Sequence, residues 1–423
     1  MYSTKIKSKK FPWGGIALAT PFPSKDTVSV VGSIAGGARA WGSNEEADVH
    51  AQMLLEGTKS HTKKELQLLL DGMGANLTFA AGNERLHFMG KVRPTHLNAF
   101  LSVVAECLTE STFPEPELAV LKMREASNLE LESQNTTAQA NIALSRLLYA
   151  KEHPNYDDTT DESVKVLKGI NAQRLREMHR KLLDRRTLVL SMAGDITPAK
   201  AFALVNSHFK SLPQNKVTFP KFTKTKVVSA KQKEVTIPNK ASIDYAAGIA
   251  AGITNTAGDY AALLLGMQIL GNRSGFSGRL MKTVREEEGL TYGTYAFPAG
   301  FTATTDGHLY IWATFAPQLY EKGKVSIARQ VTKILTDGVT ADEVKKHRQL
   351  YEARSRVQLS NSGAFARAAH DTVVDGKPLK YLDEFPKKIL KLTAAQVNKA
   401  LKKYLLQNKL SEAAAGTFLD PSI

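Results

Sequence analysis

The segment Lys165-Val-Leu-Lys-Gly-Ile-Asn-Ala-Gln173 has an echo near the end of the chain, Lys388-Ile-Leu-Lys-Leu-Thr-Ala-Ala-Gln396. Each copy leads into a predicted helix and then into a strand. The first of these strands closes in Ala193-Gly194 and the second in Ala414-Ala415-Gly416. A recurrence of this kind at long separation indicates an internal duplication, with halves of roughly 200 residues.

Each half reads as strands, then helices, then a final strand. In the first half we expect strands at 15–20, 27–34, 76–81, 85–92 and 187–193, and helices at 43–57, 62–70, 95–108, 115–132, 137–149 and 172–183. This order favours the α+β class, with two homologous αβ sandwich domains, each a mostly antiparallel sheet with helices on one face. The join is expected at 212–240, which is rich in Lys, Pro and polar residues. The predicted domains are therefore residues 1–211 and 241–423.

Composition narrows the class of protein. The formal net charge of +15 raises the question of an acidic or nucleic-acid partner. Because the basic residues are spread over predicted helix faces and the linker, and no nucleic-acid motif accompanies them, a solvated surface is the better account. No apolar run approaches the roughly 20 residues of a bilayer span, so we expect a soluble chain without a transmembrane segment. The basic start of the chain has no apolar signal core, so any export signal is expected to be absent or already removed.

The stretch 270–297 carries the residues with the clearest binding chemistry. It predicts a glycine-punctuated loop, a helix over 277–288 that stops at Gly289, and then a strand. Arg285 falls in the last helical turn and Tyr292 just past the corner. A guanidinium beside a phenol can hold peptide carbonyls or a carboxylate. The alternative is that Tyr292 packs in the sheet while Arg285 pairs with a neighbouring glutamate, and the stretch alone leaves both open.

The duplicated halves, the run Met53-Leu-Leu-Glu-Gly-Thr58 and the run Arg285-Glu-Glu-Glu-Gly-Leu-Thr-Tyr292 resemble the pitrilysin and insulysin superfamily of zinc peptidases, the inverzincins. The similarity is greatest to the short-chain branch that includes mitochondrial processing peptidase and bacterial relatives, and it covers nearly the whole chain. It implies a fold that forms half of a clamshell. In these peptidases a His-x-x-Glu-His motif immediately precedes the first run, two histidines binding zinc and the glutamate serving as general base.

At that place this chain has Asp48-Val-His-Ala-Gln52. Gln52 is a poor zinc ligand, Ala51 has no proton-transfer group, and His50 points away from the 48/52 face, so we interpret it as an ordinary core or surface histidine. Glu130, or less favourably Glu132, falls near the place of the third ligand of the family. The resemblance therefore predicts no metal site and no catalytic residue in residues 1–211, and a retained substrate-binding pair, Arg285 and Tyr292, in residues 241–423.

Two function classes follow from this resemblance. In the first, the chain is the metal-free subunit of a heterodimeric zinc metallopeptidase. It is not a peptidase alone, and Arg285 and Tyr292 serve the active site of a homologous partner that carries zinc and an intact His-x-x-Glu-His motif. In the second, it is a structural scaffold resembling the core subunits of respiratory complexes, without a proteolytic role. The compartment stays open, with bacterial periplasm or cytoplasm favoured over an organelle.

Overall fold

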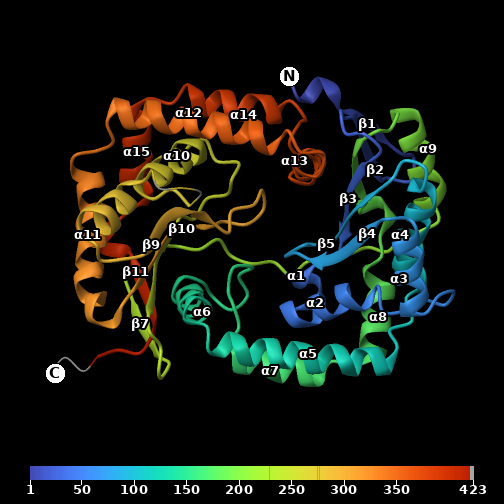
Figure 1. The fold of residues 1–423 in the computed structure, drawn as a ribbon, viewed down its shortest axis with the longest axis horizontal. Coiled ribbons are helices and arrows are strands. Elements are labelled where there is room, and N and C mark those ends of the chain that lie inside the picture. The colour runs from blue at the N-terminus through green and yellow to red at the C-terminus, as the bar shows by residue number, and fades with distance from the viewer. Residues whose placement is uncertain (228, 274, 276, 420–423) are drawn as a thin grey trace. The chain divides into compact units, whose positions relative to one another are not determined.

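The computed structural model describes residues 1–227, 229–273, 275 and 277–419. Contacts divide the chain into two units (Figure 1). The first comprises Met1–Ser127, Asp161–Lys221 and Ser355–Glu384, and the second comprises Asn128–Thr160, Phe222–Arg354 and Phe385–Ile423. The units are therefore interleaved along the chain, whereas the sequence suggested two contiguous domains.

The sheet of the first unit has the strand order β1-β2-β6-β3-β5-β4. The strands are β1 (Lys7–Lys10), β2 (Ile16–Pro21), β3 (Val28–Ala35), β4 (Asn76–Ala81), β5 (Arg85–Val92) and β6 (Val189–Gly194). Only the β2–β6 pair is parallel. All eight residues of β3 are buried, which is expected for a run of β-branched and small residues in the middle of a sheet.

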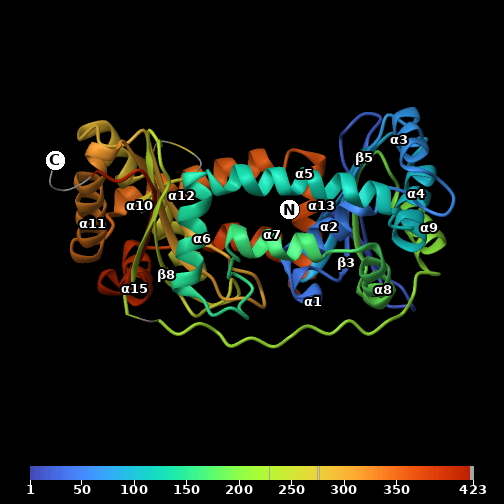
Figure 2. The ribbon, with the colours of Figure 1, turned by 90° about the horizontal axis from the view of Figure 1, so that it is seen from below.

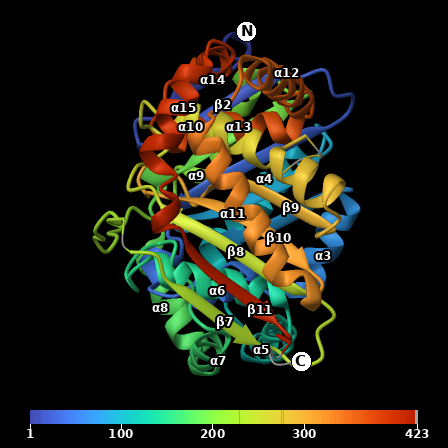
Figure 3. The ribbon, with the colours of Figure 1, turned by 90° about the vertical axis from the view of Figure 1, so that its left-hand side faces the viewer.

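The sheet of the second unit repeats this plan with the order β7-β11-β8-β10-β9, seen side by side in Figure 3. Its strands are β7 (Gln232–Thr236), β8 (Ile243–Ala250), β9 (Gly293–Ala299), β10 (His308–Phe315) and β11 (Ser411–Gly416). Again one pair is parallel, β7 with β11, while the other neighbours are antiparallel. The correspondence with β2-β6-β3-β5-β4 supports the duplication, and the α+β class is confirmed.

The helices of the first unit are α1 (Ala38–Trp41), α2 (Asn44–Met53), α3 (Lys63–Gly72), α4 (Leu97–Glu110), most of α5 (Glu115–Ser133), most of α7 (Thr160–Gly169), α8 (Ala172–Leu182), α9 (Pro198–Phe209) and α13 (Ser362–Val374). The second unit has α6 (Thr136–Leu148), α10 (Tyr260–Leu270), α11 (Tyr320–Thr336), most of α12 (Ala341–Gln358) and α15 (Ala394–Tyr404). The helix α14 (Tyr381–Leu390) crosses the division between the units.

Each sheet also receives one helix from the other half of the sequence. Helix α6 packs on β8 and β11, where Ala140, Leu144 and Leu148 contact Ala246 and Tyr310. Helix α13 packs on β3 and β6 of the first sheet. The opposite face of the second sheet packs on its own core cluster, which includes residues of α10, α11 and α15. Both faces of that sheet are therefore covered by helices, whereas the sequence predicted helices on one face only. The additional helix, α6, comes from the other half of the sequence, and we call α6 and α13 the exchanged helices.

The expected linker 212–240 is shorter in the structure. Helix α9 ends at Phe209 and β7 begins at Gln232, so part of the expected linker is a strand of the second sheet. Described residues between 215 and 231 form no helix or strand and run as extended chain (Figure 2). Within the described residues, no helix combines the length and the apolar character that a membrane crossing requires.

Candidate functional site

Helix α2 carries the residues at the place of the expected metal motif. The side chain of Ser43 caps its first turn by accepting a hydrogen bond from the backbone N–H of Glu46 (3.2 Å). The helix ends at Met53, four residues before the expected end at Gly57, which has a φ of +146°. The buried side of α2 includes Val49, His50 and Ala51.

His50 belongs to the core, as one of the two interpretations of the sequence had it. Its Nε2 lies 2.9 Å from Nδ1 of His179 on α8, and its ring lies between Trp41 and Phe113. Burial, followed by the neighbouring His179, lowers the pKa of His50 well below its ordinary value. Both imidazoles are therefore neutral at pH 7, and neither faces the 48/52 side of the helix.

The chemistry of the 48/52 face is set by helix α5. Arg124 donates a hydrogen bond from Nη2 to Oε1 of Gln52. Asp48 is an exposed residue, yet protein atoms displace part of the water around its carboxylate, and this desolvation raises its pKa to about 6. The charges of Glu45 and Glu125 make smaller contributions in the same direction. The face therefore has one carboxylate that gains a proton easily, one amide and one guanidinium.

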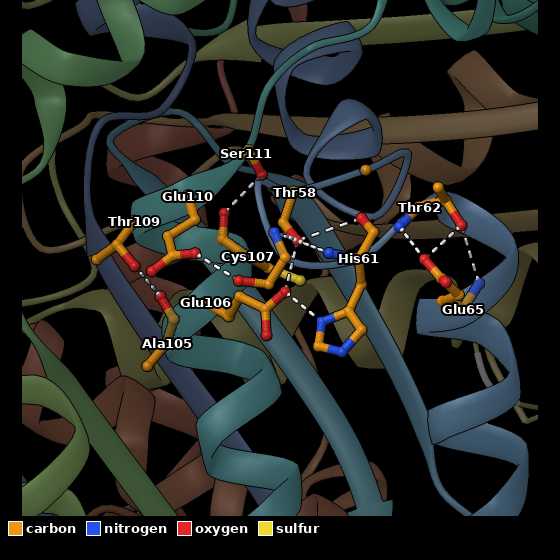
Figure 4. A network of polar contacts seen from close by, with 12 residues as sticks. Thr58, His61, Thr62, Glu65, Ala105, Glu106, Cys107, Thr109, Glu110 and Ser111 are labelled. Carbon is orange, nitrogen blue, oxygen red and sulfur yellow. Dashed lines mark hydrogen bonds and ion pairs between the residues drawn. The ribbon is translucent and has the colours of Figure 1, made fainter.

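The run that follows α2 is tied to the end of α4 by a network of polar contacts (Figure 4). Oε1 of Glu106 accepts a hydrogen bond from the hydroxyl of Thr58 and lies 2.8 Å from Nδ1 of His61. Ser111 donates from its hydroxyl to the carbonyls of Leu54 (3.2 Å) and Cys107 (2.7 Å). These contacts fix the C-terminal end of α2, so the family-like run at 53–58 has a structural role.

The helix that carries Arg285 is a π-helix over Met281–Glu287, where the sequence predicted an α-helix over 277–288. The widened turn is closed by hydrogen bonds from the N–H of Glu288 to the carbonyl of Thr283 (3.0 Å) and from the N–H of Leu290 to the carbonyl of Val284 (2.9 Å). Gly289 has a φ of +62°, which is the expected left-handed stop. Residues 274 and 276 of the preceding glycine-punctuated loop lie outside the described residues.

Arg285 and Tyr292 are brought together as the sequence suggested. The guanidinium carbon of Arg285 lies 4.9 Å from the centroid of the Tyr292 ring, a cation–π distance. Tyr292 is 82% exposed and precedes β9, so it does not pack in the sheet. Within the strand, by contrast, Thr294 and Ala296 are buried on one face while Tyr295 and Phe297 pack toward α6 on the other.

Two of the three neighbouring glutamates have partners of their own. Glu288 accepts hydrogen bonds from Ser326 (2.6 Å) and Arg329 on α11, and Glu287 lies 3.8 Å from Lys282. Two residues before this helix begins, Arg279 donates to both carboxylate oxygens of Glu343 on α12, at 2.7 Å each. The helix that carries Arg285 is thus anchored at both ends by pairs to α11 and α12.

Two sequence models of one peptidase family match the chain. The model described as "Insulinase (Peptidase family M16)" matches residues 23–156, and the one described as "Peptidase M16 inactive domain" matches residues 169–351. The chain belongs to the insulinase (M16) family.

Individual relatives within the M16 family are distant. The chain is 23% identical over 354 residues to the "Uncharacterized zinc protease YmxG" of Bacillus subtilis, with 82% of each chain covered. It is 21% identical to the "Non-peptidase homolog YmxG" of Helicobacter pylori over 87% of this chain and 83% of that one. A crystal structure named as a peptidase M16 inactive domain from Pseudomonas fluorescens superposes with a TM-score of 0.88 at 22% identity, covering 98% of both chains.

The residues of this M16 chain do not fit the zinc ion that the family implies. Gln52 binds a guanidinium, whose positive charge disfavours a metal cation beside it, and Ala51 is buried and has no proton to transfer. Among the described residues, no group of three or more His, Cys, Asp or Glu side chains is placed to hold a metal ion.

The place of the third ligand, expected at Glu130 or less favourably at Glu132, stays a prediction. Among the carboxylates of α5, Glu125 is the one whose charge contributes to the raised pKa of Asp48. On one helix, five residues correspond to roughly 140° of rotation, so Glu125 and Glu130 point in different directions. Sequence reasoning missed Arg124 and Glu125 because only the packing of α5 beside α2 shows that they share a face with Gln52 and Asp48.

Proposed function

We propose that this chain is a metal-free subunit of a two-chain zinc metallopeptidase. A homologous subunit with an intact His-x-x-Glu-His motif supplies the zinc and the activated water. This chain supplies Arg285 and Tyr292, which bind the peptide substrate in trans. The proposal rests on one contrast, since the zinc position of the family is degenerate while the Arg285–Tyr292 pair is kept, with Tyr292 exposed and Arg285 half-buried.

The exposure of Tyr292 supports a binding role for the pair. A tyrosine that served only to fill the corner would be expected to bury its ring, yet Tyr292 is 82% exposed with a guanidinium over it. The phenol can donate a hydrogen bond to a peptide carbonyl. The guanidinium acts only as a donor, and it can donate several hydrogen bonds in a fixed geometry. The anchoring of the π-helix by Glu343 and Glu288 holds this geometry in place before the substrate arrives.

The proposal is tested in a reconstituted complex with a zinc-bearing family member from the same source. The Arg285→Ala and Tyr292→Phe variants should each lower peptide cleavage by roughly tenfold or more, since one oriented hydrogen bond to the substrate or transition state is worth on the order of 1–4 kcal/mol. Assembly and zinc content should be unchanged. Lys282→Ala is a matched control, because Lys282 lies on the same helix with a side chain that is 72% exposed. Wild-type rates from both variants would contradict the binding role.

The second candidate is a scaffold without any proteolytic role, and the printed name of the Helicobacter pylori relative, a non-peptidase homolog, favours it. It predicts a stable complex that never cleaves peptides. The same reconstitution separates the two, because a scaffold gives an assembled complex without activity.

A further inference from the structure

Helix α13 packs on the first sheet through an apolar surface, with one polar contact at each end of that surface. The hydroxyl oxygens of Ser29 and Ser362 lie 2.9 Å apart, and Oγ of Ser33 lies 2.8 Å from Nε2 of His370. Ser29 and Ser33 are four residues apart on β3, so both point to the face that α13 covers. Between them the helix packs through Phe365, Ala366 and Ala369 on Leu18, Val31 and Ala193.

The hydrogen bonds around His370 fit a neutral ring. Nε of Arg85 donates to Oγ of Ser33 (2.6 Å), and the Ser33 hydroxyl can donate its own hydrogen to Nε2 of His370. On the other side of the ring, Nδ1 lies 2.8 Å from Oδ1 of Asp371 and donates to it. The order Ser–His–Asp matches that of an acyl-transfer triad. However, Ser33 and His370 are both 0% exposed, so no substrate reaches them and their role is internal to the interface.

The charged groups that face His370 are mostly positive. They are Arg85 of β5 and Arg367 and Asp371 of α13, and the ring of His87 on β5 lies 5.8 Å from the ring of His370. The neighbouring strands β2, β3 and β6 contain no charged residue. The guanidinium of Arg85 is satisfied by Ser33 and by the carbonyl of Thr187. A proton on His370 would therefore place a second cation beside a buried guanidinium.

We propose that α13 is a pH-gated latch, which leaves the first sheet in weakly acidic solution when His370 takes up a proton, before the sheet itself unfolds. Burial, above all other causes, lowers the pKa of His370, and it lowers the pKa of His87 to about 4. A released histidine has a pKa near 6.5. Docking is therefore complete above pH 6.5 and weakens as the pH falls below it, by up to about tenfold per pH unit for each imidazole.

Amide hydrogen exchange of the full chain, read by mass spectrometry at pH 7, 6 and 5 and corrected for intrinsic rates, tests the latch. Between pH 6 and pH 5 the protection of the α13 amides should fall by about tenfold, and at each pH it should stay below the protection of the central strands β3 and β6, which exchange only when the sheet unfolds. Protection of α13 that does not depend on pH would overturn the proposal. So would protection of α13 equal to that of β3 and β6 at each pH, because α13 would then be exposed only when the sheet unfolds as a whole.

Two variants assign the effect to His370. His370→Gln keeps an acceptor for Ser33 but takes up no proton. The protection of its α13 amides should therefore depend less on pH than in the wild type, by up to about a factor of ten per pH unit, which corresponds to one proton. Ser362→Ala removes the other polar contact without removing a titratable group, so it should lower α13 protection by the same factor at every pH. A wild-type slope in His370→Gln would refute the assignment. If that variant does not fold, the wild-type profile and Ser362→Ala still decide whether α13 leaves before the sheet.

Discussion

At the scale of the residue, helix α2 shows how one altered motif divides into a core side and a solvent side. His50 lies in the core beside His179, whereas Asp48 lies exposed near Glu45 and Glu125. Neither arrangement supplies the two histidines and the glutamate of the family's zinc motif. At the place of the family's zinc motif, this chain thus has a carboxyl group with a raised pKa, Asp48, and an imidazole with a lowered pKa, His50.

The His50–His179 pair makes the stability of the first unit sensitive to acid. Burial lowers the pKa of His179 to about 4. Because the unfolded ring has a pKa near 6.5, the unfolded state binds the proton first, so the stabilisation is present above pH 6.5 and is lost as the pH falls toward 4. Between pH 7 and pH 5 we expect His179 to account for a loss of about 2 kcal/mol in the free energy of unfolding.

Urea denaturation at pH 7, 6 and 5 measures this loss. The His179→Gln variant should be less stable at pH 7 but should show a smaller decrease between pH 7 and pH 5. Equal decreases in the variant and the wild type would mean that the pair does not control the acid response.

At the scale of the element, the π-helix over Met281–Glu287 is the clearest difference from the sequence prediction. The position of Arg285, the stop at Gly289 and the alternation in β9 follow from local rules, namely helix termination and the period of two in a strand. The π-turn does not follow from these rules, and the residues that contact its two ends lie on α11 and α12, far along the chain.

The Arg279–Glu343 pair is expected to stabilise this element measurably. Oε2 of Glu343 also accepts a hydrogen bond from the N–H of Thr340 at the start of α12 (2.8 Å), so Glu343→Ala loses two sets of contacts. A cost of about 1–3 kcal/mol in the free energy of unfolding is expected, measured by chemical denaturation. Glu321→Ala is the control, since its side chain is 73% exposed, and it should cost under about 1 kcal/mol. Equal costs would contradict the anchoring role.

At the scale of the whole molecule, the exchanged helices α6 and α13 explain why the sequence predicted the fold class but not the division into units. The apolar spacing of Ala140, Leu144 and Leu148 predicts a helix with one buried face. It contains no information about which of two similar sheets that face covers. The duplication was visible because each half repeats the same order of elements, while the exchange became visible only from tertiary contacts.

The connection between the units is expected to be the first site of proteolysis. Lys221 and Lys224 lie between two contacts: Nη2 of Arg39 donates to the carbonyl of Pro220, and the N–H of Thr225 donates to Asp306 (2.9 Å). Because this stretch is irregular and offers lysines, limited digestion with trypsin should cut there first. Mass spectrometry of the early fragments identifies the site. A first cut between residues 53 and 70 would contradict this organisation.

The central claim is that this M16 chain is a metal-free subunit that acts only with a zinc-bearing partner. The most direct measurement combines elemental analysis with peptide cleavage, on the purified chain after saturation with zinc and dialysis, on the zinc-bearing homologue, and on the two together. The account predicts no stoichiometric zinc and no cleavage by this chain alone, and chelator-sensitive cleavage by the mixture above that of the homologue. One tightly held zinc ion in this chain, together with chelator-sensitive cleavage by the chain alone, would contradict it.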